Sequence, residues 1–338
     1  MTVRYSVAVV GATGLVGSTL LSIFQERKFP IKELFLIASE QSLGKKINIG
    51  NTEHPIYPLS SFDFRQTNLA FFCVSNELAA NYIPKATDAG NIVIDKSSFF
   101  RHYPDVPLLV PEVNINDLIH YRNKNIIANP NCNTIPLAVA LKPIYDAVGI
   151  ARINVVTMQS VSGTGKDALF ELRQQSAQLL ANEKIQPTIY AKQIAFNVLP
   201  HCDDFQENGY TREEMKIVLE LQKIFNDKTL AINSTSVRVP VFCGHAAAVH
   251  LETKDKLTAS QAAQLLSHAE GVKLTTGRYP YSTPAGDAAG RDEVFVGRLR
   301  DDISCDNGLD LWVVADNLRK GAALNAIQIA ERLIKNYL

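Results

Sequence analysis

The feature that most constrains the fold is a glycine-rich turn formed by Gly11, Gly14 and Gly17. It follows a short apolar run, Tyr5–Val10, which predicts a strand, and it precedes an amphipathic run that ends near Arg27 and predicts a helix. Glycine lets the backbone turn tightly and approach a pyrophosphate, which then lies at the helix N-terminus. The spacing Gly-x-x-Gly-x-x-Gly differs from the commoner Gly-x-Gly-x-x-Gly, and an ordinary tight turn is the alternative interpretation.

The segments after this turn predict further strands and helices in alternation. Residues 34–39 form the next apolar run, at the distance expected for a βαβ unit. More strands are predicted at residues 69–74, 91–95 and 125–128, with a helix at residues 77–89. The first part of the chain is therefore predicted to be a doubly wound, Rossmann-like half.

The end of the second strand in a dinucleotide-binding fold contacts the adenosine ribose. An acidic residue there favours NAD, and a basic residue favours the 2′-phosphate of NADP. This chain has Ser39, Lys45 and Lys46, which suit a phosphate, but also Glu40, which suits a free ribose. A solvated loop without a cofactor role would explain the lysines equally well, so the sequence leaves both cofactors open.

Length and composition favour an ordinary globular protein. The chain has 338 residues, of which 46% are hydrophobic, and is long enough for about two domains. A formal net charge of +0 gives no electrostatic signal for nucleic acid or an anionic membrane, so small-molecule partners are expected. The sequence has no apolar run of about 18 residues and no signal-peptide pattern. We therefore expect no membrane span and a cytoplasmic location.

The 5 cysteines are scattered and odd in number, with none of the paired spacings of zinc sites or disulfide scaffolds. We therefore expect no metal site and a reducing environment. Cys132 stands out because it lies between the predicted strand at residues 125–128 and a helical pattern at Thr134–Val148, in which Pro136 is tolerable in the first turn. The helix dipole and free backbone N–H groups there favour a thiolate and can hold an oxyanion. Free cysteines are also common as inert buried residues, so a partner base is needed.

A candidate base follows the predicted strand at residues 235–241, which contains Arg238. His245 comes just past the end of that strand, beside Gly244. A histidine, with an ordinary pKa near about 6.5, suits acid or base catalysis with a thiol. A hydrogen-bonded core histidine is the alternative interpretation. Cys243 and His245 as metal ligands are disfavoured because no second close pair completes a site.

The second half of the chain has longer strands and helices, which predict a mixed α+β domain. Strands are predicted at residues 151–160, 246–254 and 293–300, and helices at residues 167–181 and 212–225. A strongly amphipathic helix at residues 317–337 could return to the first domain.

Two polar patterns in this half allow more than one interpretation. Thr211 and Glu214 match a helix capping box, whereas Glu213 and Lys216 lie on one helix face, either as a surface ion pair or as a site for a zwitterionic, phosphate-bearing ligand. The glycine-rich residues 159–166 end a strand, but the P-loop pattern is not met, because its first glycine is a serine and an aspartate follows the lysine. A turn that lends backbone amides to a cofactor or substrate is expected instead.

Taken together, the chain resembles the aspartate-semialdehyde dehydrogenase family, phosphate-dependent NADP enzymes of lysine, threonine and methionine biosynthesis, over essentially its whole length. The resemblance depends on residues 11–17, 96–101, 129–134, 159–165, 238–245 and 316–322, with Glu213 and Lys216. It implies a Rossmann-like dinucleotide-binding domain, residues 1–131 completed by a C-terminal helix at 318–338. It also implies a mixed α+β catalytic and dimerisation domain at residues 132–317, an α/β fold like that of glyceraldehyde-3-phosphate dehydrogenase.

The resemblance also implies a role for each matching residue. Cys132 would be the acyl-thioester nucleophile, His245 the acid and base, and Gln159 would orient the acyl intermediate. Substrate would be bound by Arg238 at its carboxylate, by Glu213 at its amino group, and by Arg101, Asn131 and Lys216 at its phosphate. NADP would be bound by Gly11, Thr13, Gly14, Leu15, Val16, Ser39, Ser162, Gly163 and Asn317. Because many members carry a basic residue where this chain has Glu40 and Gln41, NAD use is also possible.

The expected partners are aspartyl phosphate, aspartate semialdehyde and phosphate, and the expected assembly is a homodimer or a dimer of dimers. Two alternatives remain. N-acetyl-gamma-glutamyl-phosphate reductase has similar chemistry, but its acylated substrate should not need Glu213 as a cation partner. A noncatalytic paralogue is disfavoured by the joint presence of Cys132, Gln159, Arg238 and His245.

Overall fold

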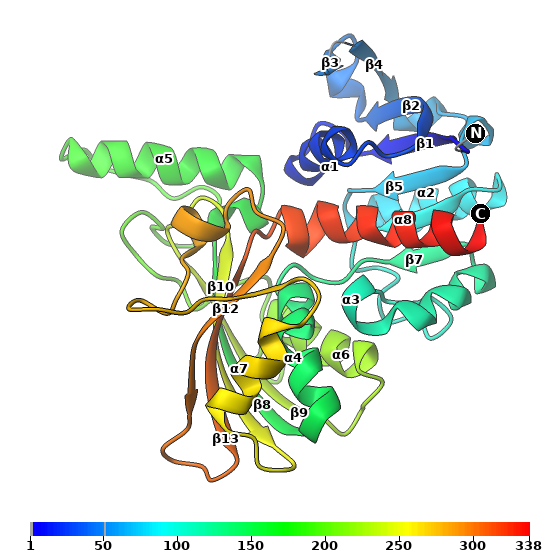
Figure 1. The fold of residues 1–338 in the computed structure, drawn as a ribbon. Coiled ribbons are helices and arrows are strands. Elements are labelled where there is room, and N and C mark those ends of the chain that lie inside the picture. The colour runs from blue at the N-terminus through cyan, green and yellow to red at the C-terminus, as the bar shows by residue number, and fades with distance from the viewer. Residues whose placement is uncertain (1–2, 51) are drawn as a thin grey trace. The chain divides into compact units, whose positions relative to one another are not determined.

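The computed structural model describes residues 3–50 and 52–338, which form two compact units (Figure 1). The first unit runs up to Asn131 and also contains Ala322–Leu338, whereas the second unit is Cys132–Gly321.

The first unit is built on a seven-stranded sheet with the strand order β3-β4-β2-β1-β5-β6-β7. All neighbouring strands are parallel except β3 and β4. The strands are β1 Tyr5–Val10, β2 Ile31–Ala38, β3 Lys46–Ile49, β4 Thr52–Pro58, β5 Leu69–Phe72, β6 Ile92–Asp95 and β7 Ile126–Ala128. The helices are α1 Leu15–Glu26, α2 Asn76–Asp88, α3 Pro111–Asn114 and α8 Leu324–Tyr337. The predicted doubly wound half is confirmed, but the short strands β3 and β4 were not predicted.

The C-terminal helix α8 belongs to the core of the first unit, where it packs against α1 and β6. Arg27 of α1 pairs with Glu331 of α8 at 2.7 Å. Regular α-helix begins at Leu324, but it is preceded directly by a π-helical turn at Arg319–Ala323, so helical structure begins close to the predicted residue 318. The Asp316 side chain accepts hydrogen bonds from the backbone N–H groups of Leu318 and Arg319, as a helix-capping side chain does.

The second unit contains a six-stranded sheet with the order β11-β12-β13-β10-β8-β9. The strands are β8 Ile150–Gln159, β9 Ala231–Arg238, β10 His245–Thr253, β11 Val272–Leu274, β12 Val294–Asp301 and β13 Gly308–Ala315. The helices are α4 Thr134–Val148, α5 Lys166–Leu180, α6 Arg212–Ile224 and α7 Ala259–Ser267. Helices α4, α6 and α7 pack on the sheet, whereas α5 extends away from it (Figure 1).

The predicted mixed α+β character of this unit is confirmed, although β11, β13 and α7 were not predicted. Strand β9 begins before the predicted residue 235 and ends at Arg238 rather than at residue 241. Pro240 explains the early end, because proline has no N–H to donate to a neighbouring strand. Among the described residues, no helix is long and apolar enough to cross a membrane.

Candidate active site

Cys132 lies just before α4, as predicted, and is half-buried. Asn133 follows it in a helical conformation at the N-cap position, and its Nδ2 lies 3.9 Å from the Cys132 Sγ. Gly321 packs on the other side, since a Cβ atom there would lie 2.9 Å from the Cys132 carbonyl oxygen. The thiol is therefore fixed at a helix N-terminus, where dipole and backbone N–H groups favour negative charge.

His245 begins β10 and is only 4% exposed. Its Nδ1 accepts a hydrogen bond from the backbone N–H of Ser160 at 3.0 Å, so the proton of the neutral ring is on Nε2. Burial, and next the charge of Arg238, lower the pKa of His245 from 6.5 to about 3. The ring is therefore neutral at pH 7. Its pKa is lower than the ordinary value expected from the sequence, because the strand places the ring away from water and beside a cation.

Cys132 and His245 line the same small cavity, together with Asn133 and Ala246. Its volume of about 10 Å³ is close to the minimum needed for one water molecule. The His245 Nε2 is buried and has no hydrogen-bond partner in residues 3–50 and 52–338. A buried donor without a partner costs free energy, so such an atom is expected to serve a ligand.

Arg238, at the end of β9, carries a second buried donor atom. The side chain is 7% exposed, and its Nη1 donates to the carbonyl oxygen of Ser160 at 2.7 Å. Its Nε is buried and lacks a partner among the residues that the structure describes. A Cβ atom at Gly163 would lie 3.1 Å from the Arg238 Nη1 and 3.2 Å from the His245 Nε2, so both side chains approach this glycine. The arrangement suits a ligand that carries a carboxylate close to its reacting carbon.

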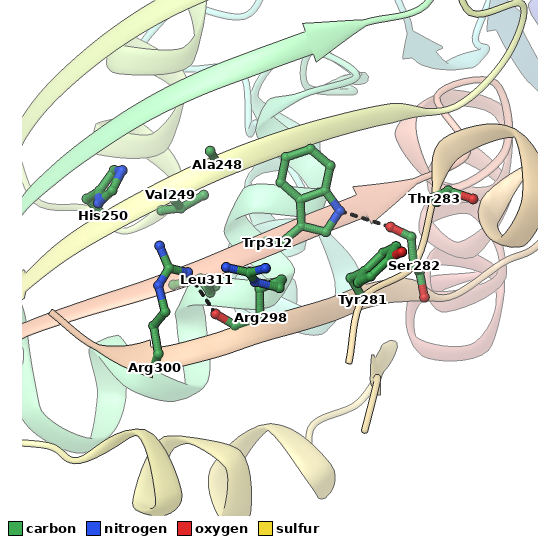
Figure 2. Close-up of a pocket in the computed structure, with 10 residues that line it drawn as sticks. All are labelled: Ala248, Val249, His250, Tyr281, Ser282, Thr283, Arg298, Arg300, Leu311 and Trp312. Carbon is green, nitrogen blue, oxygen red and sulfur yellow. Dashed lines mark hydrogen bonds between the residues drawn. The ribbon is translucent and has the colours of Figure 1, made fainter. Parts of the chain in front are cut away.

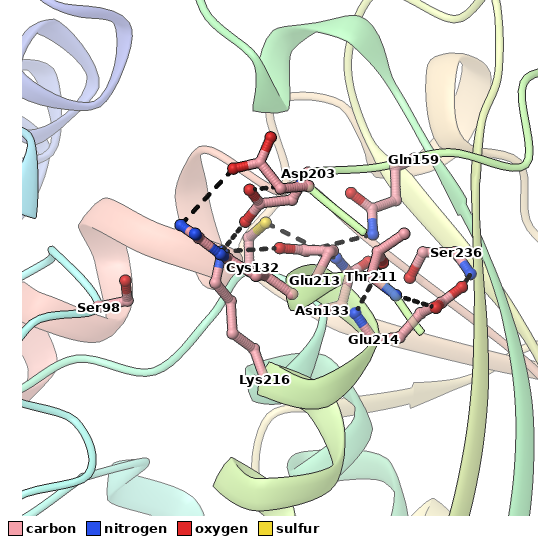
Figure 3. A network of polar contacts seen from close by, with 12 residues as sticks. Ser98, Cys132, Asn133, Gln159, Asp203, Thr211, Glu213, Glu214, Lys216 and Ser236 are labelled. Carbon is pink, nitrogen blue, oxygen red and sulfur yellow. Dashed lines mark hydrogen bonds and ion pairs between the residues drawn. The ribbon is translucent and has the colours of Figure 1, made fainter. Parts of the chain in front are cut away.

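Glu213 is the centre of a polar network beside Cys132 (Figure 3). Its Oε1 accepts from Asn133 at 3.0 Å and from Gln159 at 3.2 Å, and its Oε2 pairs with Lys216 at 3.3 Å. The carboxylate is 7% exposed. The network thus brings together three of the predicted side chains, Gln159, Glu213 and Lys216, in the second unit.

The capping-box prediction for α6 is confirmed. The Thr211 hydroxyl accepts from the backbone N–H of Glu214, and the Glu214 carboxylate accepts from the backbone N–H of Thr211 at 2.7 Å. The other carboxylate oxygen of Glu214 accepts from the backbone N–H of Ser236 on β9 at 2.8 Å. Glu214 therefore fixes the helix end that carries Glu213 and Lys216.

The glycine turn of the first unit is packed too tightly for side chains. Gly11 has a φ of +86°, and a Cβ atom there would lie 2.3 Å from the Cys73 carbonyl oxygen. A Cβ atom at Gly17 would lie 2.2 Å from the Gly11 carbonyl oxygen. Among the described residues, no side chain caps the N-terminus of α1 at Gly14, which leaves the first N–H groups of the helix without a side-chain cap. This cradle fits a pyrophosphate.

Other predicted ligand residues are divided between the units. Arg101 and Asn131 are buried in the first unit, and the Arg101 guanidinium donates to the carbonyl oxygen of Lys96. In the second unit, Ser162 and Asn317 are hydrogen-bonded to each other at 2.9 Å. Asn317 also accepts from the backbone N–H of Gly244, so it supports the turn that precedes His245.

Comparisons with known proteins decide the family. The model "Semialdehyde dehydrogenase, NAD binding domain" matches residues 6–121, and "Semialdehyde dehydrogenase, dimerisation domain" matches residues 141–320. Aspartate-semialdehyde dehydrogenase 2 of Vibrio cholerae is 52% identical over 337 residues, which cover 100% of both chains. The chain belongs to the aspartate-semialdehyde dehydrogenase family. The resemblance inferred from the sequence motifs is thus confirmed.

Solved structures of aspartate-semialdehyde dehydrogenases agree with this assignment. The crystal structure of aspartate semialdehyde dehydrogenase II from Vibrio cholerae matches with a TM-score of 0.98 and 51% identity, covering 99% of this chain and 100% of that chain. The complex of that enzyme with ASA matches with the same values. The predicted combination of a Rossmann-like domain with a dimerisation domain is therefore correct for this family member.

A larger cavity of about 410 Å³ lies elsewhere in the second unit of this semialdehyde dehydrogenase family member (Figure 2). It is lined by Ala248, Val249, His250, Tyr281, Ser282, Thr283, Arg298, Arg300, Leu311 and Trp312. These lining residues include no cysteine and no carboxylate, whereas the smaller cavity contains Cys132. Nearby, His250, Asp302 and Asp310 form a cluster of metal-ligand type, but Arg300 already pairs with Asp310 at 2.9 Å.

The sequence analysis did not single out three residues that the structure places at this site. Ser160 contacts both His245 and Arg238 through its backbone, and Asn133 links Cys132 to Glu213. Asp203 pairs with Lys216 at 2.6 Å. The position of Asn133 beside the nucleophile was a usable signal, whereas the other two depend on contacts between segments distant in the chain.

Proposed function

We propose that this protein catalyses the NADPH-dependent reductive dephosphorylation of L-4-aspartyl phosphate to L-aspartate 4-semialdehyde. The observation that carries the proposal is a pair of buried donors, His245 Nε2 and Arg238 Nε, that have no partner among the described residues, with Cys132 in the cavity of His245. The names of the closely similar relatives support the same reaction.

Cys132 is the proposed nucleophile. Its thiolate attacks the acyl carbon of the aspartyl phosphate, the C–O bond to phosphate breaks, and a thioester remains on the sulfur. NADPH, when bound, supplies the hydride that reduces this thioester. The amide of Asn133 lies close enough to the sulfur to hold it in place.

His245 is the proposed acid and base. As the imidazolium, His245 donates its Nε2 proton to the oxygen of the thiohemiacetal as negative charge develops there, and the neutral ring takes that proton back as aldehyde and thiolate separate. A thiolate in the same cavity raises the pKa of His245, because an opposite charge favours the imidazolium. In the imidazolium, the proton on Nδ1 replaces the hydrogen bond from the Ser160 backbone N–H, and the Ser160 hydroxyl, 3.1 Å from Nδ1, is placed to accept that proton.

The substrate contacts follow the charges of the ligand. Arg238 grips the carboxylate by a two-pronged hydrogen bond, Glu213 holds the amino group, and Gln159 orients the acyl intermediate. Arg101, Asn131 and Lys216 bind the phosphate. The buried carboxylate of Glu213 favours a substrate with a free ammonium group over the acylated amine of N-acetylglutamyl phosphate.

NADP is the proposed cofactor, with NAD use possible. The tight turn at Gly11 and the uncapped start of α1 support a pyrophosphate site made with Thr13, Gly14, Leu15 and Val16. Ser39, Ser162, Gly163 and Asn317 complete the proposed contacts. The carboxylate of Glu40 accepts a hydrogen bond from Ser60 at 3.1 Å, which draws it into the protein's own contacts and supports access of a 2′-phosphate to Ser39.

The proposed assembly is a homodimer or a dimer of dimers that uses the dimerisation domain at residues 141–320. Light scattering coupled to size-exclusion chromatography tests it: a mass of one chain would contradict the proposal.

The reaction is tested by following NADPH absorbance as purified protein oxidises L-aspartate 4-semialdehyde with NADP, or with NAD, in the presence and absence of inorganic phosphate. We expect phosphate-dependent turnover that is lost in Cys132→Ala, with NADP used better than NAD. No turnover with either cofactor would contradict the proposed function. Turnover with N-acetylglutamate semialdehyde instead would move the assignment to the related reductase.

A further inference from the structure

In the second unit, the carboxylate of Asp203 accepts a hydrogen bond from the ammonium group of Lys216 (Figure 3). Its Oδ2 accepts from the Lys216 Nζ at 2.6 Å, a shorter contact than the 3.3 Å from the same nitrogen to Glu213. Burial raises the pKa of Asp203, but the hydrogen bonds from Lys216 and from the Asp204 N–H, together with the charges of Lys216 and Arg212, lower it below its ordinary value of 3.8. Lys216 is thus held between two carboxylates.

The local backbone fixes this contact. Asp203 has a φ of +67°, a left-handed conformation that aspartate tolerates better than most residues, and its Oδ1 accepts from the backbone N–H of Asp204 at 2.9 Å. The Asp204 carbonyl oxygen in turn accepts from the backbone N–H of Arg212 at 2.8 Å, and Phe205 bridges to Thr211. The segment is therefore tied to the first turn of α6, the helix that carries Lys216.

We propose that Asp203 sets the affinity of the site for phosphate by competing with it for Lys216. This inference rests on the proposed function, in which Lys216 binds the phosphate group. A phosphate and the Asp203 carboxylate are both anions, so placing both at one ammonium group is opposed by their mutual repulsion. Phosphate binding at Lys216 therefore weakens the hydrogen bond of Asp203, and that hydrogen bond weakens phosphate binding.

The competition has a use in the proposed reaction. Inorganic phosphate is the product that leaves when the thioester forms on Cys132. When the Asp203 carboxylate forms its hydrogen bond with Lys216 again, it favours the departure of phosphate. It also opposes the reverse attack of phosphate on the thioester. Asp203 is thus an affinity-determining residue, and it need not touch the reacting carbon.

The test compares Asp203→Asn with wild type by isothermal titration calorimetry with inorganic phosphate. Asparagine keeps the left-handed backbone and an oxygen for the Asp204 N–H, but removes the negative charge. We expect the Kd for phosphate to fall about threefold to fivefold, the range for a partly exposed ion pair. Asp204→Asn is the matched control, because Asp204 is highly exposed and its nearest cation is Arg212 at 3.6 Å; its Kd should equal that of wild type.

An unchanged or higher Kd in Asp203→Asn would overturn the proposal, as would equal tightening in Asp204→Asn or no measurable binding of phosphate to wild type. Lys216→Ala should abolish the difference between the aspartate and asparagine forms, and a persistent difference would also overturn it. The turnover assay separates the two claims. Tighter phosphate binding by Asp203→Asn without phosphate-dependent turnover in wild type would defeat the proposed function while supporting the role of Asp203.

Discussion

At the scale of single residues, the candidate site depends on buried polar atoms that have no partner in the part of the chain that the structure describes. His245 and Arg238 each carry one such atom, and both side chains are hydrogen-bonded to backbone groups of Ser160. Burial without a partner destabilises the folded state, and a ligand that supplies the partner recovers that free energy. These two atoms therefore indicate where a substrate carboxylate and a reacting oxygen belong.

Arg238→Lys tests the carboxylate contact. Lysine keeps the positive charge but cannot make a two-pronged hydrogen bond to a carboxylate. We expect kcat/KM for L-aspartate 4-semialdehyde to fall roughly 10-fold to 100-fold, the range for losing a charged hydrogen bond. Steady-state kinetics measure this, and a value within a factor of about two of wild type would show that Arg238 does not hold the carboxylate.

The lowered pKa of His245 predicts a pH dependence of stability. Because the pKa is about 3 in the folded protein and 6.5 in its ordinary environment, only the unfolded state gains a proton between these values. Stability is therefore lost as pH falls below about 6.5, by at most about 1.4 kcal/mol per pH unit. Urea denaturation between about pH 7 and about pH 5 should show a larger loss for wild type than for His245→Asn. Equal losses would contradict the shift.

At the scale of elements, the start of α6 determines where Glu213 and Lys216 lie. Thr211 and Glu214 close the helix end, and Glu214 also binds the backbone of β9 at Ser236. The helix that carries the proposed substrate-binding side chains is thereby joined to the strand that ends at Arg238. The capping box of α6 and the end of β9, which are separate signals in the sequence, are thus connected through Glu214 in the structure.

Glu214→Ala tests this link. The substitution removes the acceptor for the backbone N–H groups of Thr211 and Ser236, both of which are buried. We expect a loss of about 2–4 kcal/mol in the free energy of unfolding, from one helix cap and one buried hydrogen bond. Urea denaturation measures it, with the exposed Glu207→Ala as the control expected to change little. A loss no larger than that of the control would show that the cap is dispensable.

At the scale of the whole molecule, the first unit is assembled from both ends of the chain. Helix α8 supplies Leu324, Ile327 and Leu333 to the core that also contains the strands of the glycine-turn half. Asn325 of this helix donates to Leu109 and Asn129, close in sequence to Cys132. The chain therefore completes its nucleotide-binding half only after the second unit has been made.

Leu333→Ala tests the contribution of α8. Leu333 is fully buried, so its truncation leaves a cavity in the core of the first unit. We expect a loss of about 2–5 kcal/mol in unfolding free energy. Lys335→Ala, on the exposed side of the same helix, is the control. If both variants unfold at the same urea concentration, α8 does not stabilise this unit.

Sequence patterns predicted most elements near the site because their signals are local. The strand β1, the turn at Gly11 and the helix α4 behind Cys132 each follow from periodicity and from residues that favour turns or helix ends. What the pattern did not predict is that the first turn of the C-terminal helix, Arg319–Ala323, is π-helical and that regular α-helix begins only at Leu324. Asp316 accepts hydrogen bonds from the N–H groups of Leu318 and Arg319 and thereby caps this start.

The sequence by itself determined the family and the two-part α/β architecture and indicated Cys132 as the proposed nucleophile, because motifs and apolar periodicity depend on neighbours along the chain. Only the tertiary structure decided the neutral Nε2–H form of His245 and the capture of Lys216 by Asp203. The pKa and the ion pair depend on burial and on groups brought together from distant segments, and the spacing of residues in the sequence does not contain that information.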